Sequence, residues 1–246
     1  MSNIDLSLII SCYNEELILE NSMKQIFEVL DNTHFSYEII FVDDYSNDNT
    51  REIIEKIISE YPNKRIIKIF HERNIGRGGS VTDGIKVAKG EIVGFIDIDL
   101  EIHARYIPSC VLAIKNGFDI ATAHRIYKVQ IKSFIRYLMS KGYILLVRLL
   151  LNVNLLDTET GFKFFNREKI LPIIDEIGEK GWFWDTEIMV RAYLKRYKIK
   201  EIPCLYIKNF AKKTTVKNIS DTVYYFKKLL RFRKTIQRWN INNTVK

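Results

Sequence analysis

Short apolar runs recur along the first half of the chain, and each is followed by a polar turn and a segment whose apolar residues have helical spacing. The runs are rich in β-branched residues and predict strands at 6–10, 37–42, 66–70, 92–96 and 119–125. Helices are predicted between them, in 17–30, in 51–60 and from the glycine-rich turn 74–80 to residue 88. Strands that alternate with helices form parallel sheets with helices on their faces, so the pattern predicts an α/β fold around a mostly parallel central sheet.

The predicted strand at 92–96 ends in three carboxylates at alternate positions, Asp97, Asp99 and Glu101. In an extended chain alternate side chains point the same way, so we expect all three to face one crevice. Such a concentration of negative charge favours a hard divalent cation, Mg²⁺ or Mn²⁺, which keeps coordination positions open for substrate phosphates. A solvated acidic turn is the alternative interpretation.

Polar residues also follow the first two predicted strands. Tyr13 and Glu15 come after the first strand, and Asp43 and Asp44 end the second. Open α/β sheets bind ligands at the carboxyl ends of their strands, so these four side chains are candidate ligand contacts.

The turns before the second and third predicted helices differ in composition. Asp48 or Thr50 is expected to cap the helix at 51–60. In the turn 74–80, glycines allow backbone N–H groups to approach an anion closely, and Arg77 adds positive charge. Glycine-rich turns also occur as simple bends, so this motif alone does not decide between the two.

Length and composition limit the possible classes of protein. A chain of 246 residues, 47% of them hydrophobic, can bury the core of one α/β domain. We expect a catalytic domain at 1–211, with a nucleotide half at about 1–100 and an acceptor half at about 101–211, and a basic segment at 212–246. Three widely spaced cysteines indicate a reducing cytosol rather than a disulfide framework or a zinc site, and no signal peptide is recognised. The net charge of +8 indicates an anionic partner.

Four motifs follow one another in the first half of the chain. They are Tyr13-Asn14-Glu15, Val42-Asp43-Asp44-x-Ser46-x-Asp48-x-Thr50, Asn74-x-Gly76-Arg77-Gly78 and Asp97-x-Asp99. Their order and spacing resemble the large family of inverting nucleotide-sugar glycosyltransferases with the A-type, Rossmann-like fold. The resemblance implies that Glu15 and Asp44 hold the nucleoside of a UDP- or GDP-hexose with support from Asp43. It also implies that Asp97 and Asp99 bind the metal of the donor diphosphate.

The second half of the chain carries three further motifs. They are Arg136-x-x-x-Ser140, Asp157-Thr158-Glu159-Thr160-Gly161 and Trp182-Phe183-Trp184-Asp185. These motifs are similar to the polyprenyl-phosphate glycosyltransferases, the group that includes dolichyl-phosphate mannosyl- and glucosyltransferases. The resemblance implies that Glu101 completes the metal and diphosphate site. It also implies that Arg125 and Arg136, together with Ser140, receive the lipid phosphate.

The sequence departs from the pattern of that group in two places. Ile102-His103-Ala104 stands where the group usually has a His-Pro-Pro-like turn. Thr214-Thr215 stands where the group has a Ser-Lys element, and it is preceded by Lys212 and Lys213. Lys213 is therefore the candidate for contact with the donor phosphates.

Two classes of acceptor are compatible with these residues. An acceptor phosphate is already anionic at pH 7, so it needs positioning, for which Arg125 and Arg136 are suited, and no strong general base. A hydroxyl acceptor needs a carboxylate to take its proton, and the candidates are Asp185 and Glu187, which can instead be ordinary helix-start residues. We expect metal-dependent, inverting transfer of a hexose from a nucleotide sugar to polyprenyl phosphate. The alternatives are transfer to a hydroxyl in capsule, cell-wall or protein-linked glycan synthesis, and a catalytically silent nucleotide-sugar-binding module.

Two segments have the composition of helices that lie on a membrane surface. The run at 142–151 is apolar but too short to span a bilayer, and Arg148 interrupts it. The segment 216–239 mixes aromatic residues and leucines with lysines and arginines, which attract anionic lipid. We expect a peripheral enzyme on the cytoplasmic face of a membrane and no nucleic-acid partner, since no nucleic-acid-binding motif accompanies the charge. Packing of either segment on the domain is the alternative, and a membrane-protein partner or a homo-oligomer is left open.

Overall fold

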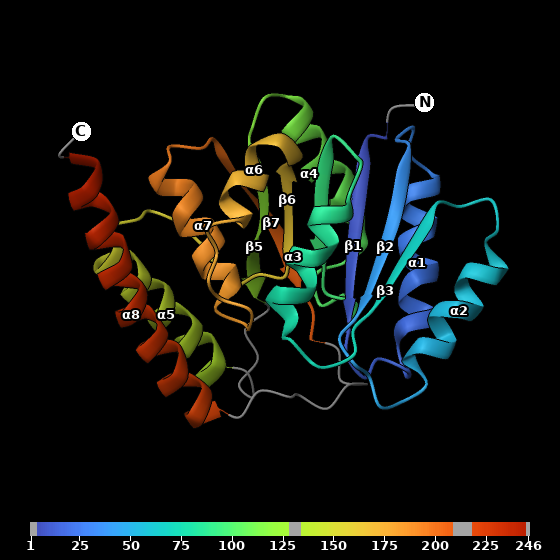
Figure 1. The fold of residues 1–246 in the computed structure, drawn as a ribbon, viewed down its shortest axis with the longest axis horizontal. Helices are drawn as coiled ribbons and strands as arrows, with labels where there is room; N and C mark the ends of the chain where they lie inside the picture. Colours follow the sequence, from blue (N-terminus) through green and yellow to red (C-terminus); the bar gives the residue numbers. More distant parts are fainter. Residues whose placement is uncertain (1–3, 128–133, 209–217, 245–246) are drawn as a thin grey trace.

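A computed structural model gives the backbone of residues 4–127, 134–208 and 218–244, and the side chains of 4–127, 142–208 and 224–237. The described residues form one seven-stranded sheet with strand order β3-β2-β1-β4-β6-β5-β7 (Figure 1). The strands are β1 (Leu6–Cys12), β2 (Tyr37–Asp43), β3 (Ile66–Phe70), β4 (Ile92–Ile96), β5 (Ile120–Tyr127), β6 (Phe162–Asn166) and β7 (Ile199–Tyr206). The helices are α1 (Leu19–Asp31), α2 (Thr50–Glu60), α3 (Arg77–Val87), α4 (Ile107–Lys115), α5 (Phe134–Leu151), α6 (Arg167–Ile174), α7 (Trp184–Leu194) and α8 (Asn218–Thr244), with a short 3₁₀ helix at Ala104–Tyr106.

The five strands predicted from the apolar runs are confirmed. β3 and β4 have the predicted bounds, and the other three differ from the prediction by one or two residues at their ends. β1 pairs in parallel with β2 and β4, and β2 pairs in parallel with β3, as expected for strands joined by helices. The pattern predicted no bounds for β6, which runs antiparallel to both β4 and β5.

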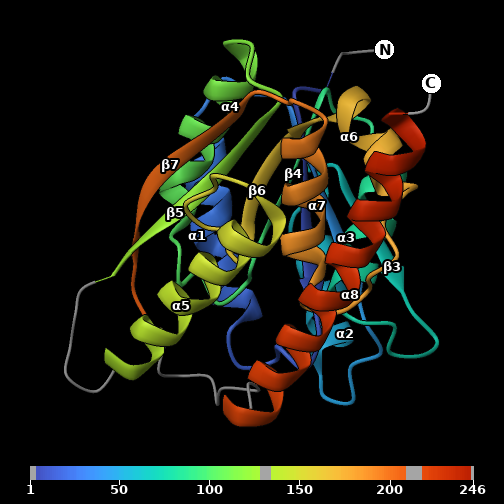
Figure 2. The same cartoon turned by 90° about the vertical axis from the view of Figure 1, so that its left-hand side faces the viewer.

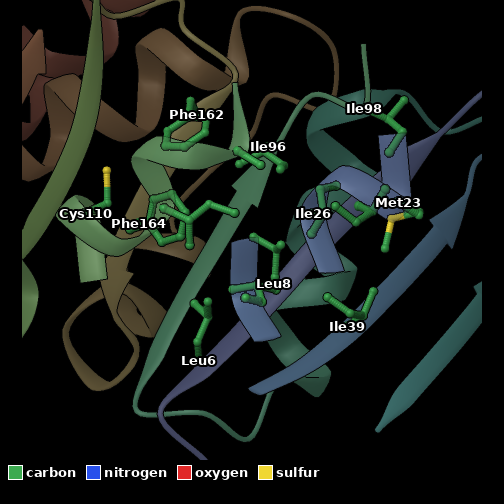
Figure 3. Close-up of a cluster of buried hydrophobic side chains, with 14 of the residues drawn as sticks. Leu6, Leu8, Met23, Ile26, Ile39, Ile96, Ile98, Cys110, Phe162 and Phe164 are labelled. Atoms are coloured by element: carbon green, nitrogen blue, oxygen red, sulfur yellow. The ribbon is translucent and has the colours of Figure 1, made fainter. Parts of the chain in front are cut away.

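Both faces of the sheet are buried, because successive residues of the central strands enter different cores. In β1, Leu8 packs into the cluster with α1, α2 and α4, and Ile9 packs into the cluster with α3 and α5–α8. Figure 3 shows Leu8 of the first cluster against Met23 and Ile26 of α1. Two-sided burial explains why the strand sequences are continuously apolar rather than alternating.

Helices α5 and α8 lie side by side at the end of the molecule opposite β3 (Figures 1 and 2). α8 buries Leu229, Phe232 and Ile236, which have helical spacing, in the same core cluster that α7 enters. α5 buries Val147 and Leu151 there. The C-terminal segment therefore packs on the domain, and the boundary at 211/212 stays a prediction. None of the described helices combines the length and the apolar character needed to cross a bilayer.

Candidate functional site

The carboxyl ends of β2, β1 and β4 lie next to one another at one edge of the sheet, because these strands are parallel neighbours. Each of the three loops that leave this edge contains a non-glycine residue with positive φ: Asn14 (56°), Tyr45 (66°) and Leu100 (50°). Such backbone conformations are costly for L-residues and concentrate at functional sites. The loops at this edge are therefore held in specific shapes by their surroundings.

The acidic run after β4 is a turn and not an extended chain. The strand ends at Ile96, the N–H of Leu100 donates to the carbonyl of Asp97 (3.2 Å), and Leu100 has a left-handed backbone conformation. The expectation that alternate positions align Asp97, Asp99 and Glu101 as on a strand is therefore wrong.

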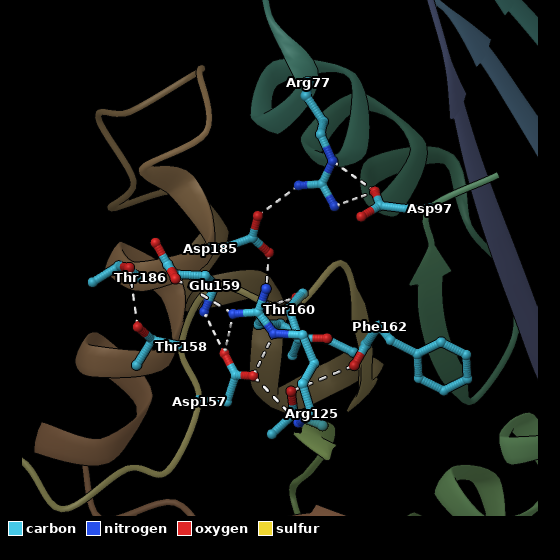
Figure 4. A network of polar contacts seen from close by, with 12 residues as sticks. Arg77, Asp97, Arg125, Asp157, Thr158, Glu159, Thr160, Phe162, Asp185 and Thr186 are labelled. Atoms are coloured by element: carbon cyan, nitrogen blue, oxygen red, sulfur yellow. Dashed lines mark hydrogen bonds and ion pairs between the residues drawn. The ribbon is translucent and has the colours of Figure 1, made fainter. Parts of the chain in front are cut away.

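Arg77, at the start of α3, joins the carboxylate after β4 to the start of α7 (Figure 4). Its Nε and Nη2 donate to Oδ1 of Asp97 (2.8 and 2.6 Å), and its Nη1 donates to Oδ2 of Asp185 (2.6 Å). Burial alone would lower the pKa of Arg77, but the charges of Asp185 and Asp97 outweigh burial and raise it. The candidate site therefore contains a buried, permanently charged guanidinium.

The second oxygen of Asp185 is held by another buried cation, Lys163 of β6. Lys163 Nζ lies 2.7 Å from Asp185 Oδ1 and also donates to the carbonyl of Thr160. The Lys163 side chain is 0% exposed and that of Asp185 is 3% exposed. Burial lowers the pKa of Lys163, and the neighbouring Asp185 carboxylate opposes that change. Each oxygen of Asp185 thus faces one cation.

The glycines of the turn before α3 allow close packing. A Cβ added at Gly76 would lie 2.5 Å from the carbonyl oxygen of Lys180, and one added at Gly78 would lie 2.3 Å from Cβ of Trp184. The glycines thus let α3 approach the start of α7, where the indole N–H of Trp184 donates to Thr82 Oγ1 (2.9 Å). The interpretation of this turn as an anion site stays a prediction.

Asp44, at the carboxyl end of β2, anchors the same turn. Its two carboxylate oxygens accept the N–H groups of Ile75 and Gly76, each at 2.8 Å. His71 Nδ1 lies 3.0 Å from Oδ1 of Asp44. Asp44 therefore links the end of β2 to the residues that place Arg77.

Asp43 is fully buried beside Asp44. Its Oδ2 accepts from Arg51 Nε (2.6 Å) and from the N–H of Ser46 (3.1 Å). Its Oδ1 has no hydrogen-bond partner among the described residues. A buried carboxylate oxygen without a donor is costly, so Asp43 Oδ1 is a candidate acceptor for a hydrogen bond from a ligand.

The polar residues of the β2 loop hold the β1 loop. Thr50 Oγ1 accepts the N–H of Glu15 (2.8 Å), and Asp48 Oδ2 accepts the N–H of Glu16 (3.1 Å). The N-cap position of α2 is held by Asn49, which makes no side-chain cap, while the predicted cap residue Asp48 accepts the N–H of Thr50, the first helical residue (3.0 Å). These contacts place buried Glu15 and 42% exposed Tyr13 at the end of β1.

Arg125 of β5 forms a second charged cluster with Asp157 and Glu159 (Figure 4). Its Nε and Nη2 donate to the two oxygens of Asp157 (2.6 and 2.9 Å), and Nη2 lies 3.4 Å from Glu159. Burial alone would raise the pKa of Asp157, but Arg125 lowers it further than burial raises it. Burial raises the pKa of Glu159. Arg125 therefore stays charged in a largely enclosed site.

The loop between α5 and β6 connects the two charged clusters. Asp157, in the middle of this loop, pairs with Arg125, while the carbonyl of Gly161, its last residue, accepts the N–H of Asp97 (2.8 Å). A Cβ added at Gly161 would lie 1.8 Å from Asp97 Oδ2, so only glycine fits behind this carboxylate. The loop thus sets the spacing between Asp97 and Arg125.

The remaining predicted site residues lie elsewhere. Glu187 accepts the N–H groups of Gly178 and Glu179 and pairs with Arg191, so it supports the loop before α7 and has no contact with Arg77 or Asp97 among these bonds. The side chains of Arg136 and Ser140 and the whole of Lys213 lie outside the described residues.

Two residues of the site were missed by the sequence reading, Lys163 and Tyr206. Lys163 is a single lysine between phenylalanines in an apolar run, a pattern that indicates a buried charge with a partner. The phenol of Tyr206, at the end of β7, donates to Oε2 of Glu101. No sequence signal identifies Tyr206, because it is one of 13 tyrosines.

The residues after β4 fit a Mg²⁺ or Mn²⁺ ion that is held together with a diphosphate. Both Arg77 bonds end on Oδ1 of Asp97, so Oδ2 is left over, and the Asp97 side chain is 39% exposed. Among the side chains that the structure describes, no three His, Cys, Asp or Glu residues converge to hold a metal by themselves. One or two carboxylates, completed by phosphate oxygens and water, are nevertheless the usual protein contribution to a Mg²⁺ site.

The sequence is similar to that of several characterised transferases. It is 30% identical over 207 residues to the glycosyltransferase AglD of Haloferax volcanii, covering 82% of this chain and 33% of that protein. It is 32% identical over 222 residues to a dolichyl-phosphate beta-glucosyltransferase of Saccharomyces cerevisiae, covering 81% and 66%. It is 33% identical over 204 residues to a dolichol-phosphate mannosyltransferase of Pyrococcus furiosus, covering 80% and 55%. The chain thus spans one third to two thirds of the length of these relatives.

The fold is shared with glucosyl-3-phosphoglycerate synthase from Mycobacterium tuberculosis. The superposition has a TM-score of 0.67 at 17% identity and covers 94% of this chain and 80% of that chain. That enzyme was crystallised with Mn²⁺, UDP and glucosyl-3-phosphoglycerate, and also with Mg²⁺ and UDP. The likeness confirms the A-type, Rossmann-like glycosyltransferase fold. Residues 7–171 match the model of glycosyl transferase family 2, and the chain belongs to that family.

Proposed function

We propose that this chain transfers a hexose, with inversion, from a UDP- or GDP-sugar to the phosphate of a polyprenyl lipid at a membrane surface. Two of the relatives described above are named for dolichyl or dolichol phosphate, which supports a lipid phosphate as acceptor. Because the chain spans only part of the length of those relatives, the support for a phosphate acceptor comes mainly from the residues of the site.

The observation that carries the proposal is the double ion pair of Asp185. Arg77 and Lys163 each hold one of its oxygens at 2.6 and 2.7 Å, and the side chain is almost fully buried. Both oxygens of Asp185 are already engaged by a cation in an almost closed site, so this carboxylate is poorly placed to reach an acceptor hydroxyl. A phosphate acceptor needs no such base.

The donor half of the proposal uses the edge formed by β1, β2 and β4. The orphan oxygen of Asp43 and the nearby Glu15 and Asp44 would receive donors of the nucleoside. Asp97, Asp99 and Glu101 would hold Mg²⁺ or Mn²⁺, which would neutralise charge on the departing diphosphate. Arg77 holds Asp97 in place and adds a fixed positive charge beside the leaving group.

The acceptor half uses Arg125. Its bonds to Asp157 and Glu159 use Nε and Nη2, so Nη1 is the group that would donate to an acceptor phosphate. Asp157 fixes the plane of the guanidinium, and a fixed guanidinium is pre-organised for phosphate. Arg136 and Ser140 stay predictions for the acceptor phosphate, and Lys213 stays a prediction for the donor phosphates.

The outward faces of α5 and α8 support attachment to a membrane. α5 exposes Leu145, Leu146 and Leu149, which have helical spacing, while Arg148 turns inward and donates to the carbonyl of Leu155 (2.7 Å). This arrangement is the reverse of an ordinary surface helix. A helix that exposes leucines and turns its half-buried arginine inward suits a lipid surface.

α8, which packs beside α5, exposes a basic stripe. Lys227, Arg231 and Lys234 are exposed at helical spacing on the side away from the core. Such residues attract anionic headgroups. We infer that the enzyme lies peripherally on the cytoplasmic face, with α5 and α8 against the lipid.

The proposal is tested by sugar transfer from radiolabelled UDP- and GDP-sugars into an organic-extractable product. The assay contains purified protein, polyprenyl phosphate, and Mg²⁺ or Mn²⁺, with EDTA as the control. Label in the lipid phase that EDTA abolishes is the expected result, and it also identifies the donor. Metal-dependent hydrolysis of the donor without lipid label would move the acceptor to a hydroxyl. If the assay gives no lipid label and no hydrolysis of the donor, the chain is a silent binding module.

Membrane attachment is expected to depend on the basic stripe of α8. Changing Lys227, Arg231 and Lys234 together to glutamine removes three charges at about 1 kcal/mol each, so partitioning onto anionic vesicles should fall by roughly 100-fold. The measurement is co-sedimentation with vesicles containing 30% phosphatidylserine at low salt. Glutamine at the exposed Lys24, Lys86 and Lys89, in the nucleotide half, is the matched control with the same change in charge. Equal losses in both triple variants would contradict attachment through α8.

A further inference from the structure

Tyr206, the last residue of β7, contacts the acidic turn that follows β4. Its phenol donates to Oε2 of Glu101, and the N–H of the next residue, Ile207, donates to the carbonyl of Glu101 (2.8 Å). An isolated β-bridge pairs Ile102 with Tyr206. The end of β7 therefore fixes both the backbone and the carboxylate of Glu101.

The ring of the same tyrosine contacts Arg125. The guanidinium carbon lies 6.0 Å from the ring centroid of Tyr206 and 5.6 Å from that of Tyr127. The two rings pack with centroids 4.9 Å apart, because Tyr127 and Tyr206 are paired neighbours in the parallel ladder of β5 and β7. Arg125 is thus held by Asp157 through its nitrogens and by two aromatic rings at its side.

One side chain therefore holds a carboxylate of the donor half and the arginine of the acceptor half. We propose that Tyr206 is a positioning residue that sets Glu101 through its hydroxyl and Arg125 through its ring. The inference rests on the proposed function, since Glu101 and Arg125 belong to its donor and acceptor halves. Carboxylates that contribute to a metal site are commonly oriented by a hydrogen-bonded neighbour, and losing that neighbour weakens metal binding by 10- to 100-fold.

The two contacts use different parts of tyrosine, so two substitutions separate them. Tyr206→Phe removes the hydroxyl from Glu101 and keeps the ring beside Arg125. Tyr206→Leu removes both contacts. A residue that only filled space would give similar losses in the two variants, with no difference between donor and acceptor parameters.

Tyr206→Phe is expected to weaken Mn²⁺ binding by about tenfold, with the KM for polyprenyl phosphate within twofold of wild type. Tyr206→Leu is expected to weaken Mn²⁺ binding to the same extent and to raise the KM for polyprenyl phosphate about three- to tenfold. Mn²⁺ binding is measured by calorimetry on protein saturated with UDP and, in parallel, with GDP. The KM values come from the lipid-transfer assay, and thermal unfolding monitors folding.

Two controls make the result specific. Tyr197→Phe removes another tyrosine hydroxyl, one that donates to the carbonyl of Lys169 (2.8 Å), and should change neither parameter. In a Glu101→Gln chain, Tyr206→Phe should add less to the loss of Mn²⁺ affinity than it does in wild type, because the two residues act through one contact.

Each outcome decides the inference or the function. Mn²⁺ affinity of Tyr206→Phe within twofold of wild type would overturn the role of the hydroxyl, and an unchanged acceptor KM in Tyr206→Leu would overturn the role of the ring. The inference would also be overturned if wild-type protein bound no Mn²⁺ in the presence of UDP or in the presence of GDP. Wild-type protein that binds Mn²⁺ but labels no lipid would refute the proposed acceptor, while calorimetry of Tyr206→Phe would still decide the link to Glu101.

Discussion

Replacing Asp97 with asparagine is expected to lower the rate of sugar transfer by about 10² to 10³-fold while the fold is retained. The substitution keeps the shape of the side chain and removes the negative charge that, in the proposed function, would hold the divalent cation of the donor diphosphate. Loss of one such preorganised group typically costs about 3 to 4 kcal/mol of transition-state stabilisation. Arg77 keeps its second partner, Asp185, so the buried guanidinium is not left alone.

The variant is compared with wild type in the lipid-transfer assay at saturating donor and metal, with thermal unfolding in parallel. Asp175→Asn, an exposed residue at the end of α6, has the same chemical change and should retain full activity. Retention of more than a tenth of wild-type activity by Asp97→Asn would remove Asp97 from the catalytic machinery. A large loss of stability would instead assign Asp97 a structural role as the partner of Arg77.

The elements and the edge of the sheet that carries the site were predictable because both depend on local sequence. A run such as 92–96 is buried on both faces, so its apolar composition marks the strand and its first polar residue marks the end. Parallel neighbours then place Asp44 and Asp97 at one edge without any knowledge of side-chain contacts. The same reasoning could not give the turn at Leu100, because its left-handed backbone is imposed by the surrounding packing.

The ion pairs were not predictable, because their partners are distant in sequence. Arg77 and Asp185 are 108 residues apart, and Glu101 and Tyr206 are 105 apart. Sequence periodicity reports which face of an element is apolar, but it does not report which charged group another element brings to that face. The sequence therefore predicted Asp185 as a candidate base, but it could not show that Arg77 and Lys163 each pair with one of its oxygens.

The glycines before α3 illustrate a related limit. A glycine-rich turn ahead of a helix is compatible both with an approaching anion and with an approaching protein segment. At Gly76 and Gly78 the approaching atoms belong to Lys180 and Trp184. These glycines allow α3 to pack against the loop that precedes α7, and this packing brings Arg77 to Asp185. Their role in the site is therefore indirect.

Removing the carboxylate of Asp185 is expected to cause the largest loss of stability of any single change in the site. Asp185→Ala leaves Lys163, which is 0% exposed, with the carbonyl of Thr160 as its remaining hydrogen-bond partner among the described residues. Breaking a buried ion pair from one side typically costs about 3 to 5 kcal/mol, which corresponds to a decrease in Tm of roughly 10 °C for a domain of this size. Thermal and urea unfolding followed by circular dichroism measure the loss.

The pH dependence and two further variants identify the unpaired lysine as the cause. Burial lowers the pKa of Lys163 in the folded state, so in Asp185→Ala the charged lysine destabilises the fold fully at pH values below that pKa. The loss of stability should decrease as the pH rises from there towards the ordinary lysine pKa of 10.5. Lys163→Met in the same chain should recover part of the lost stability by removing the buried charge. Glu20→Ala, which breaks the exposed pairs with Lys24 and Lys56, should leave the Tm unchanged. If the loss of stability in Asp185→Ala does not depend on pH and is not reduced by Lys163→Met, the loss is due to the packing of α7. Asp185 would then again be a candidate base.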